Sequence, residues 1–139
     1  MQNEDTGMLV KLGDLAETVA NPDEDIRGRH VKDRNGEDIG KVDDLLVDEQ
    51  ERKVRLLEVA SGGFLGIGQD KTFLPVDAIT AIGEDEVRID QTREHVADAP
   101  SYDPKLIRER ATYSTVYDYY GYDPFWGAAY MYPAYPYYR

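Results

Sequence analysis

The sequence predicts an all-β fold, a small antiparallel β-barrel over residues 26–90 with short helical turns and an irregular C-terminal extension. Three observations predict it. Short apolar runs alternate with turn residues along this stretch, which is typical of strands joined by tight connections. No helix of ordinary length fits between the turns. Asn35-Gly36 tolerates the positive φ angles that a tight hairpin needs.

Residues 1–25 are predicted to be an acidic arm and linker, with residues 1–8 disordered. Two alternatives stay open for residues 9–19. Four apolar side chains at helical spacing would form one stripe of a helix: Leu12, Leu15, Ala16 and Val19. The other alternative is an extended arm on the barrel, which Gly13 and Asp14 favour because they interrupt the stripe.

The first three strands are predicted over residues 26–32, 38–48 and 53–60. The alternation of the second strand slips near Asp43 and Asp44, which indicates a bulge that bends the strand. The third strand carries apolar side chains on both faces, Val54 and Leu56 on one and Leu57 and Val59 on the other. The outer face of this strand is therefore expected to be covered by the arm or by the tail.

A glycine-rich loop follows at residues 61–70, and a strand over residues 71–76 is expected to place Pro75 at an edge or a strand end. Residues 76–79 are predicted to form one helical turn that closes the barrel. Residues 80–90 are predicted to form the last hairpin, with Val87 and Ile89 inward.

Residues 91–112 are predicted to be a short helical connector. Thr92 is a candidate cap for a helix through Ala97, and Asp103-Pro104 is a typical start for a helix to Thr112. Residues 113–139 are a tyrosine-rich tail. Its glycines and prolines, and the absence of a period in residues 119–127, predict an irregular or disordered segment that is either free or folded back.

Four short motifs together resemble the PRC-barrel family: Gly28-Arg29-His30-Val31, Asn35-Gly36 with Ile39-Gly40-Lys41-Val42, the strand from Asp44 to Asp48, and Leu74-Pro75-Val76-Asp77-Ala78-Ile79. Members include the cytoplasmic domain of the photosynthetic reaction-centre H subunit, the C-terminal domain of a bacterial ribosome maturation factor and stand-alone bacterial proteins. The loop Gly62-Gly63-Phe64-Leu65-Gly66 is similar to that of the stand-alone type. The resemblance implies a six-stranded barrel that serves as an assembly surface and not as a catalyst. The chain lacks the membrane helix of the H subunit, and residues 1–25 are too short to replace the extra domain of the ribosome factor.

Composition limits the classes of partner. The formal net charge is −12, and the acidity lies on the arm and the barrel, so nucleic-acid binding is disfavoured. The chain has no cysteine, no run of eighteen apolar residues and no secretory signal pattern. These features predict a cytoplasmic protein without disulfides or a transmembrane segment.

The sequence offers no pattern for catalysis, a cofactor or a metal site. His30 and His95 lack neighbouring ligands or a nucleophile, so neither zinc binding nor a catalytic triad is expected. The loop over residues 61–68 lacks the Gly-Lys-Ser/Thr end of a phosphate-binding loop. The acidic run through Asp43, Asp44, Asp48, Glu49 and Glu51 lacks the spacing of a calcium loop. We therefore expect a protein that is not an enzyme.

The expected function is a protein-interaction or assembly module, with the aromatic tail as a second contact for a protein partner or a second copy. Candidate partner contacts are Phe64, Leu65, Tyr119, Tyr120, Tyr122, Phe125 and Trp126. The alternative is an RNA- or ribosome-associated maturation factor. It requires a basic patch on one barrel face, built from Arg27, Arg29, Lys41, Arg55 or Arg88. A small-molecule or enzymatic role would require a concave pocket with convergent polar groups.

Overall fold

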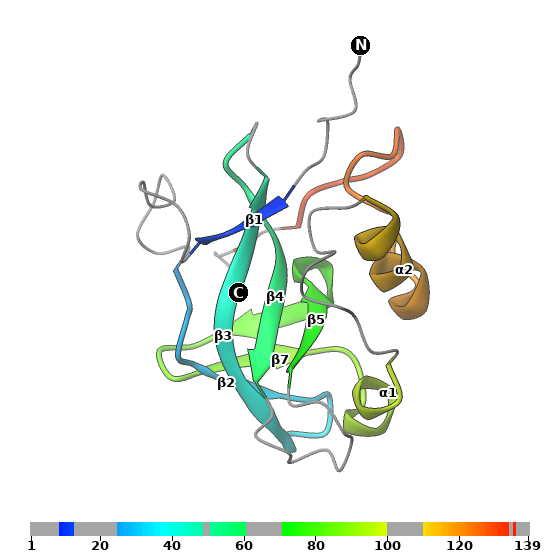
Figure 1. The fold of residues 1–139 in the computed structure, drawn as a ribbon. Coiled ribbons are helices and arrows are strands. Elements are labelled where there is room, and N and C mark those ends of the chain that lie inside the picture. The colour runs from blue at the N-terminus through cyan, green and yellow to red at the C-terminus, as the bar shows by residue number, and fades with distance from the viewer. Residues whose placement is uncertain are drawn as a thin grey trace.

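The computed structural model describes residues 9–12, 25–48, 51–60, 71–99, 110–133 and 135, and their strands form one strongly bent sheet (Figure 1). The strands are β1 (Leu9–Lys11), β2 (His30–Lys32), β3 (Asp38–Asp48), β4 (Val54–Ala60), β5 (Lys71–Pro75), β6 (Ile79–Ile82) and β7 (Glu86–Ile89). A 3-10 turn at Val76–Ala78 joins β5 to β6, and two helices follow, α1 (Arg93–Ala97) and α2 (Arg110–Tyr120). The all-β prediction is confirmed.

Six strands lie in the order β5-β4-β3-β2-β7-β6, and β1 pairs with β3 as a seventh. β1 and β2 both pair with the same edge of β3. β2 pairs with the N-terminal part of β3 and β1 with its C-terminal part, and β4 pairs with the opposite edge. Two details differ from the sequence prediction. β2 and β7 pair in parallel, and β5 and β6 remain at opposite ends of the sheet, so the described strands do not close into a complete barrel.

The predicted hairpin and bulge are confirmed. Asp33 and Gly36 form the turn between β2 and β3, and the Gly36 amide donates to the Asp33 carbonyl. Pairing between β3 and β4 jumps from Val42 to Asp44, so Asp43 is the extra residue. The first strand is shorter than predicted and begins at His30, because the chain turns at Gly28 with φ of +91°.

Gly36→Ala is expected to lower the free energy of unfolding by about 1–2 kcal/mol, because a side chain disfavours the left-handed backbone. Gly36 has φ of +86°, and an added Cβ would meet only the Arg88 Nη2 atom, at 4.0 Å. Backbone conformation and not crowding therefore decides the effect. Gly83→Ala is the matched control, since its φ lies outside the left-handed region and its nearest contact would be 3.7 Å. Chemical denaturation should separate the two variants, and equal losses would contradict the explanation.

The third predicted strand is covered on both faces, as the sequence indicated. Val54, Leu56, Leu57 and Val59 are all 0% exposed. The arm contributes through β1, which supports the extended-arm alternative for residues 9–11, and Lys11 pairs with the buried carboxylate of Glu58 at 3.3 Å. The C-terminal segment also contributes, because the Tyr132 hydroxyl bonds to the Val54 carbonyl oxygen at the start of the strand.

The first helix is confirmed. The Thr92 hydroxyl accepts a hydrogen bond from the His95 amide and caps α1. The second helix was predicted to end at Thr112 and this was wrong, because α2 continues to Tyr120 and lies beside β5 (Figure 1). The buried side chains of Tyr113, Val116, Tyr117 and Tyr120 follow a helical spacing that the sequence interpretation overlooked. The proposed helix start at Asp103 lies outside the described residues.

Gly121 ends α2. Its φ is +82°, and its amide and that of Tyr122 both donate to the Tyr117 carbonyl. This left-handed glycine reverses the chain and sends the following residues back along the sheet.

Candidate functional site

Among the described residues, a buried arginine lies beneath the aromatic tail, which we define as residues 121–133 and 135. Arg55 projects from β4 and its side chain is only 4% exposed. Its Nη2 atom pairs with Asp48 at 3.2 Å and with Glu51 at 3.1 Å. The guanidinium carbon lies 4.5 Å from the ring centre of Phe125, 5.2 Å from that of Tyr132 and 5.8 Å from that of Tyr130. Arg55 thus joins the sheet to the tail: its ion pairs hold it on the sheet, and its cation–π contacts hold the tail against it.

Tyr132 fixes the tail to the start of β4. Its hydroxyl donates to the Val54 carbonyl oxygen at 2.9 Å, and Lys53 Nζ lies 5.0 Å from its ring centre. The described tail residues therefore fold back onto the sheet and cover β4, the strand with apolar side chains on both faces.

A second set of contacts joins the tail to α2. The Trp126 ring meets Tyr113 edge-on at 5.7 Å and Tyr117 at 6.0 Å, and it meets the ring of Phe125 at 5.0 Å. Edge-to-face pairs of this kind add to the stability that burial alone provides. Helix and tail therefore form one aromatic layer against the sheet.

Tyr119 and Tyr122 connect this layer to the end of the sheet and α1. Tyr119 stacks on the His95 ring at 4.3 Å, and its hydroxyl donates to the His95 carbonyl oxygen. The Tyr122 hydroxyl donates to the carboxylate of Asp90, with oxygen distances of 2.6 and 2.7 Å. Burial, followed by this carboxylate, raises the pKa of Tyr122, so its hydroxyl remains a donor at neutral pH.

The candidate partner contacts predicted from the sequence differ in how deeply they are buried. Tyr120 is buried at 6% exposure, whereas Tyr119, Tyr122, Phe125 and Trp126 are partly exposed and pack against the core. Phe64 and Leu65 lie outside the described residues. Sequence reasoning missed Arg55, Tyr130 and Tyr132 as parts of the site. An arginine within the apolar run of the third strand was the available signal for Arg55.

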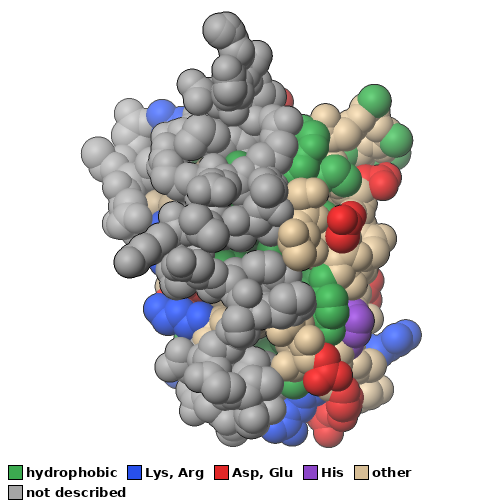
Figure 2. Space-filling view, turned by 45° about the vertical axis from the view of Figure 1, so that its right-hand side comes forward, with side chains coloured by type: hydrophobic (Ala, Val, Ile, Leu, Met, Phe, Trp, Pro, Cys, Tyr) green, Lys and Arg blue, Asp and Glu red, His purple; other side chains and the backbone are tan. Residues whose placement is uncertain are grey.

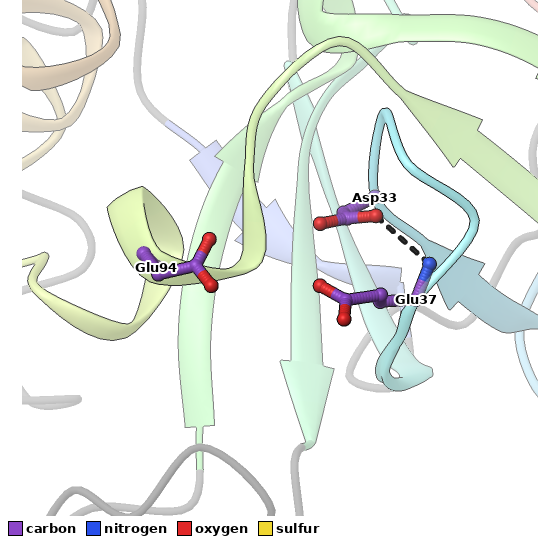
Figure 3. A group of neighbouring side chains, drawn as sticks. All are labelled: Asp33, Glu37 and Glu94. Carbon is purple, nitrogen blue, oxygen red and sulfur yellow. Dashed lines mark hydrogen bonds between the residues drawn. The ribbon is translucent and has the colours of Figure 1, made fainter.

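A cluster of three acids lies at the other end of the sheet. Carboxylate oxygens of Asp33, Glu37 and Glu94 lie within 4.8 Å of one another (Figure 3). Asp33 is fully buried and its oxygens accept hydrogen bonds from the backbone amides of Asn35, Glu37 and Arg93. These bonds join the hairpin to the start of α1, so Asp33 has a structural task that accounts for its burial.

Asp33→Asn is expected to lower the free energy of unfolding at pH 7 by about 1–3 kcal/mol, because the new amide group cannot accept all three bonds. Burial alone would raise the pKa of Asp33, but the three amides and the charge of Arg88 together hold it below 3.8. The stabilisation is therefore fully present above the ordinary carboxyl pKa of 3.8 and is lost as the pH falls through the lowered pKa of the folded state. Denaturation at pH 7 and at pH 3 should show a smaller difference between variant and wild type at pH 3, and an equal difference would contradict this account.

A hollow of about 590 Å³ lies beside β2 and is lined by Asp25, Arg27, Gly28, Arg29, His30, Glu84 and Asp85. Its walls are mostly charged, whereas ligand pockets are mostly apolar with a few polar groups. Arg27 is already held by both carboxylate oxygens of Asp25, at 2.8 and 2.7 Å, and Arg29 donates to the Gly83 carbonyl oxygen. The hollow thus offers no cationic group that lacks a partner within the described surface.

The model of the PRC-barrel domain matches residues 20–96, more than half of the chain. The chain belongs to the PRC-barrel family. The resemblance inferred from the sequence motifs is thereby confirmed, and membership indicates a protein-interaction or assembly module in general. No curated protein matches the chain. No helix among the described residues has the length and apolar character needed to cross a membrane.

Among the described residues, three of the five basic side chains predicted for an RNA-binding patch are buried or paired with acids. Arg55 is buried under the tail, Arg27 pairs with Asp25, and Arg88 pairs with Glu86 at 3.6 Å. Acids beside these guanidinium groups reduce the positive potential that a phosphate backbone would meet. The match ends at residue 96, so α2 and the aromatic tail lie beyond the family region.

Proposed function

We propose that this PRC-barrel protein is a non-enzymatic interaction or assembly module, in which the sheet is the scaffold and the tail presents an aromatic contact surface. One observation carries the proposal. Five aromatic side chains are fixed against the core yet remain partly exposed: Tyr119, Tyr122, Phe125, Trp126 and Tyr132. Met131, next to them, is 84% exposed. In Figure 2, hydrophobic side chains gather on the part of the described surface where Figure 1 places the end of α2 and the tail.

Physical chemistry favours this surface as a contact. Tyrosine and tryptophan give a large contact area and dominate the binding energy of many interfaces. The packing on Arg55 and α2 already fixes their rotamers, so less conformational entropy is lost when a partner binds. The partner is expected to be another protein or a second copy of the chain.

The experiment compares two exposed apolar positions that are changed to the same charged residue. Met131→Asp alters the tail surface, and Ala81→Asp alters the exposed edge strand β6. Light scattering first measures self-association of each purified chain, and affinity capture from the source cells then identifies partners. The proposal expects at least a tenfold weaker association for Met131→Asp and no change for Ala81→Asp.

Two results would contradict the proposal. Loss of association only in Ala81→Asp would assign the contact to the sheet edge and not to the tail. A wild-type chain that is monomeric and captures no partner would contradict the interaction function itself.

A further inference from the structure

The aromatic contact surface of α2 and the tail is also acidic. Residues 113–135 contain Asp118 and Asp123 and no lysine, arginine or histidine. Both acids are exposed, Asp118 on α2 and Asp123 two positions before Phe125. Figure 2 shows acidic side chains beside the hydrophobic ones on this part of the described surface. A partner that docks here therefore meets aromatic rings and carboxylates together.

Two further carboxylates border this surface at α1 and at the end of the sheet. The Asp90 carboxylate accepts the hydrogen bond of the Tyr122 hydroxyl at 2.6 Å. Burial, and after it the charge of Asp98, raises the pKa of Tyr119, which indicates that the exposed Asp98 carboxylate lies near this tyrosine. The negative charge thus extends along the side of the surface that faces α1.

The chain's own described cations do not neutralise this charge. Asp98, Asp118 and Asp123 form no ion pair with a described residue. Acids of the sheet are arranged differently, since exposed Asp43, for example, pairs with Lys71 at 3.0 Å. The three carboxylates of the aromatic surface are therefore available to cations from outside the chain.

The rings of the tail already bind cations of the chain itself. The Arg55 guanidinium carbon lies 4.5 Å from the ring centre of Phe125, and Lys53 Nζ lies 5.0 Å from that of Tyr132. Both rings are also partly exposed, as is Trp126, so they offer further area to a partner. Cation–π attraction is strongest with tryptophan and adds to the attraction of the carboxylates.

Charge limits the possible occupants of the surface. The carboxylates would repel the phosphate backbone of a nucleic acid or an anionic membrane surface. A second copy of the chain would bring a further net charge of −12. A neutral apolar partner would bury carboxylates without a counter-charge, which is costly. A basic segment of a protein matches both the rings and the acids.

We infer that the aromatic surface binds a basic segment of a partner protein, with cationic side chains beside its carboxylates and apolar side chains between its rings. The inference rests on the proposed function and names the occupant of the same surface. Met131, at 84% exposure, supplies apolar contact area. Arginine is expected to be preferred to lysine, because its planar guanidinium both stacks on aromatic rings and pairs with carboxylates.

The first experiment titrates the full chain with three synthetic peptides and follows the fluorescence of Trp126, the single tryptophan. The peptides repeat the triplet Arg-Leu-Ser, Gln-Leu-Ser or Glu-Leu-Ser, so that only their charge differs. The arginine peptide should bind about tenfold more tightly than the glutamine peptide, and the glutamate peptide should bind most weakly. Added salt should weaken only the binding of the arginine peptide strongly.

The second experiment removes the charges from the surface. Asp118→Asn/Asp123→Asn deletes two exposed carboxylates at nearly constant volume and should weaken binding of the arginine peptide about fivefold. Glu84→Gln/Asp85→Asn is the matched control, with the same change in net charge. Its two residues are exposed in the turn between β6 and β7, which Figure 1 shows on the other side of the molecule from α2. Binding by the control should stay within about twofold of wild type, because salt screens distant charges.

Several results would overturn the basic occupant without rejecting the contact surface. These are equal affinities for the arginine and glutamine peptides, equal weakening by the two double variants, or no binding of any peptide. Self-association of the wild type that Met131→Asp abolishes would also overturn it, because the occupant would then be a second copy. The proposed function fails separately, when the wild type neither self-associates nor captures a partner.

Discussion

Arg55→Ala should lower the free energy of unfolding by about 3–5 kcal/mol, the range found when one partner of a buried ion pair is removed. The substitution leaves the Asp48 carboxylate, which is 5% exposed, without its guanidinium partner at 3.2 Å. It also removes the platform beneath Phe125 and Tyr132. Most of the loss comes from Asp48, because the Glu51 side chain is 58% exposed and can be hydrated again.

Arg27→Ala is the matched control for this prediction. Arg27 also forms a close pair with a carboxylate, at 2.7 Å, but both side chains are about one-third exposed. Exposed pairs contribute about 0–1 kcal/mol, so a small change is expected. Urea denaturation monitored by tryptophan fluorescence reports on both variants, since Trp126 lies in the affected layer. Similar losses for the two arginines would contradict the role given to burial.

Tyr113→Ala is expected to cost about 3–5 kcal/mol, as found for large aromatic residues replaced in protein cores. Tyr113 is 0% exposed, and its ring meets Phe125 at 6.2 Å and Trp126 at 5.7 Å. The cavity left behind would remove the support of the aromatic layer from the α2 side. The tail should therefore lose protection in hydrogen exchange before the sheet does.

Asp118→Ala tests whether the effect is specific to the buried face of α2. Asp118 is exposed on the same helix, and alanine has the higher helix propensity, so stability should stay within about 0.5 kcal/mol. Thermal unfolding of both variants would measure this difference. A Tyr113→Ala protein with wild-type stability would show that α2 is not part of the cooperative core.

Local signals predicted the sheet well where the chain itself specifies the conformation. Gly36 adopts the positive φ expected for the turn, and Asp43 interrupts a clear alternation and forms the bulge. The apolar side chains on both faces of β4 correctly predicted that both faces are buried. In each case neighbouring residues along the chain determine the outcome.

Features that depend on contacts between distant residues could not be predicted from local sequence patterns. The parallel pairing of β2 with β7 joins His30 to Glu86, and no local pattern encodes its direction. Arg55 was interpreted as a surface cation, because its acids, Asp48 and Glu51, were not known to lie beside it. Residues 113–139 were expected to be irregular, and the helical part of this segment was missed because attention to its glycines, prolines and tyrosines hid the helical spacing of Tyr113, Val116, Tyr117 and Tyr120.

The bond from Tyr132 to Val54 joins residues 78 positions apart, and this separation imposes an order on folding during synthesis. β4 leaves the ribosome long before the residues that cover it. Until they emerge, a nascent chain with a paired sheet would still expose part of the β4 surface. Exposed apolar strands of this kind favour aggregation and chaperone binding. Docking of the tail onto β4 therefore cannot begin until residues far beyond the sheet have been synthesised, and until then the β4 surface lacks its aromatic cover.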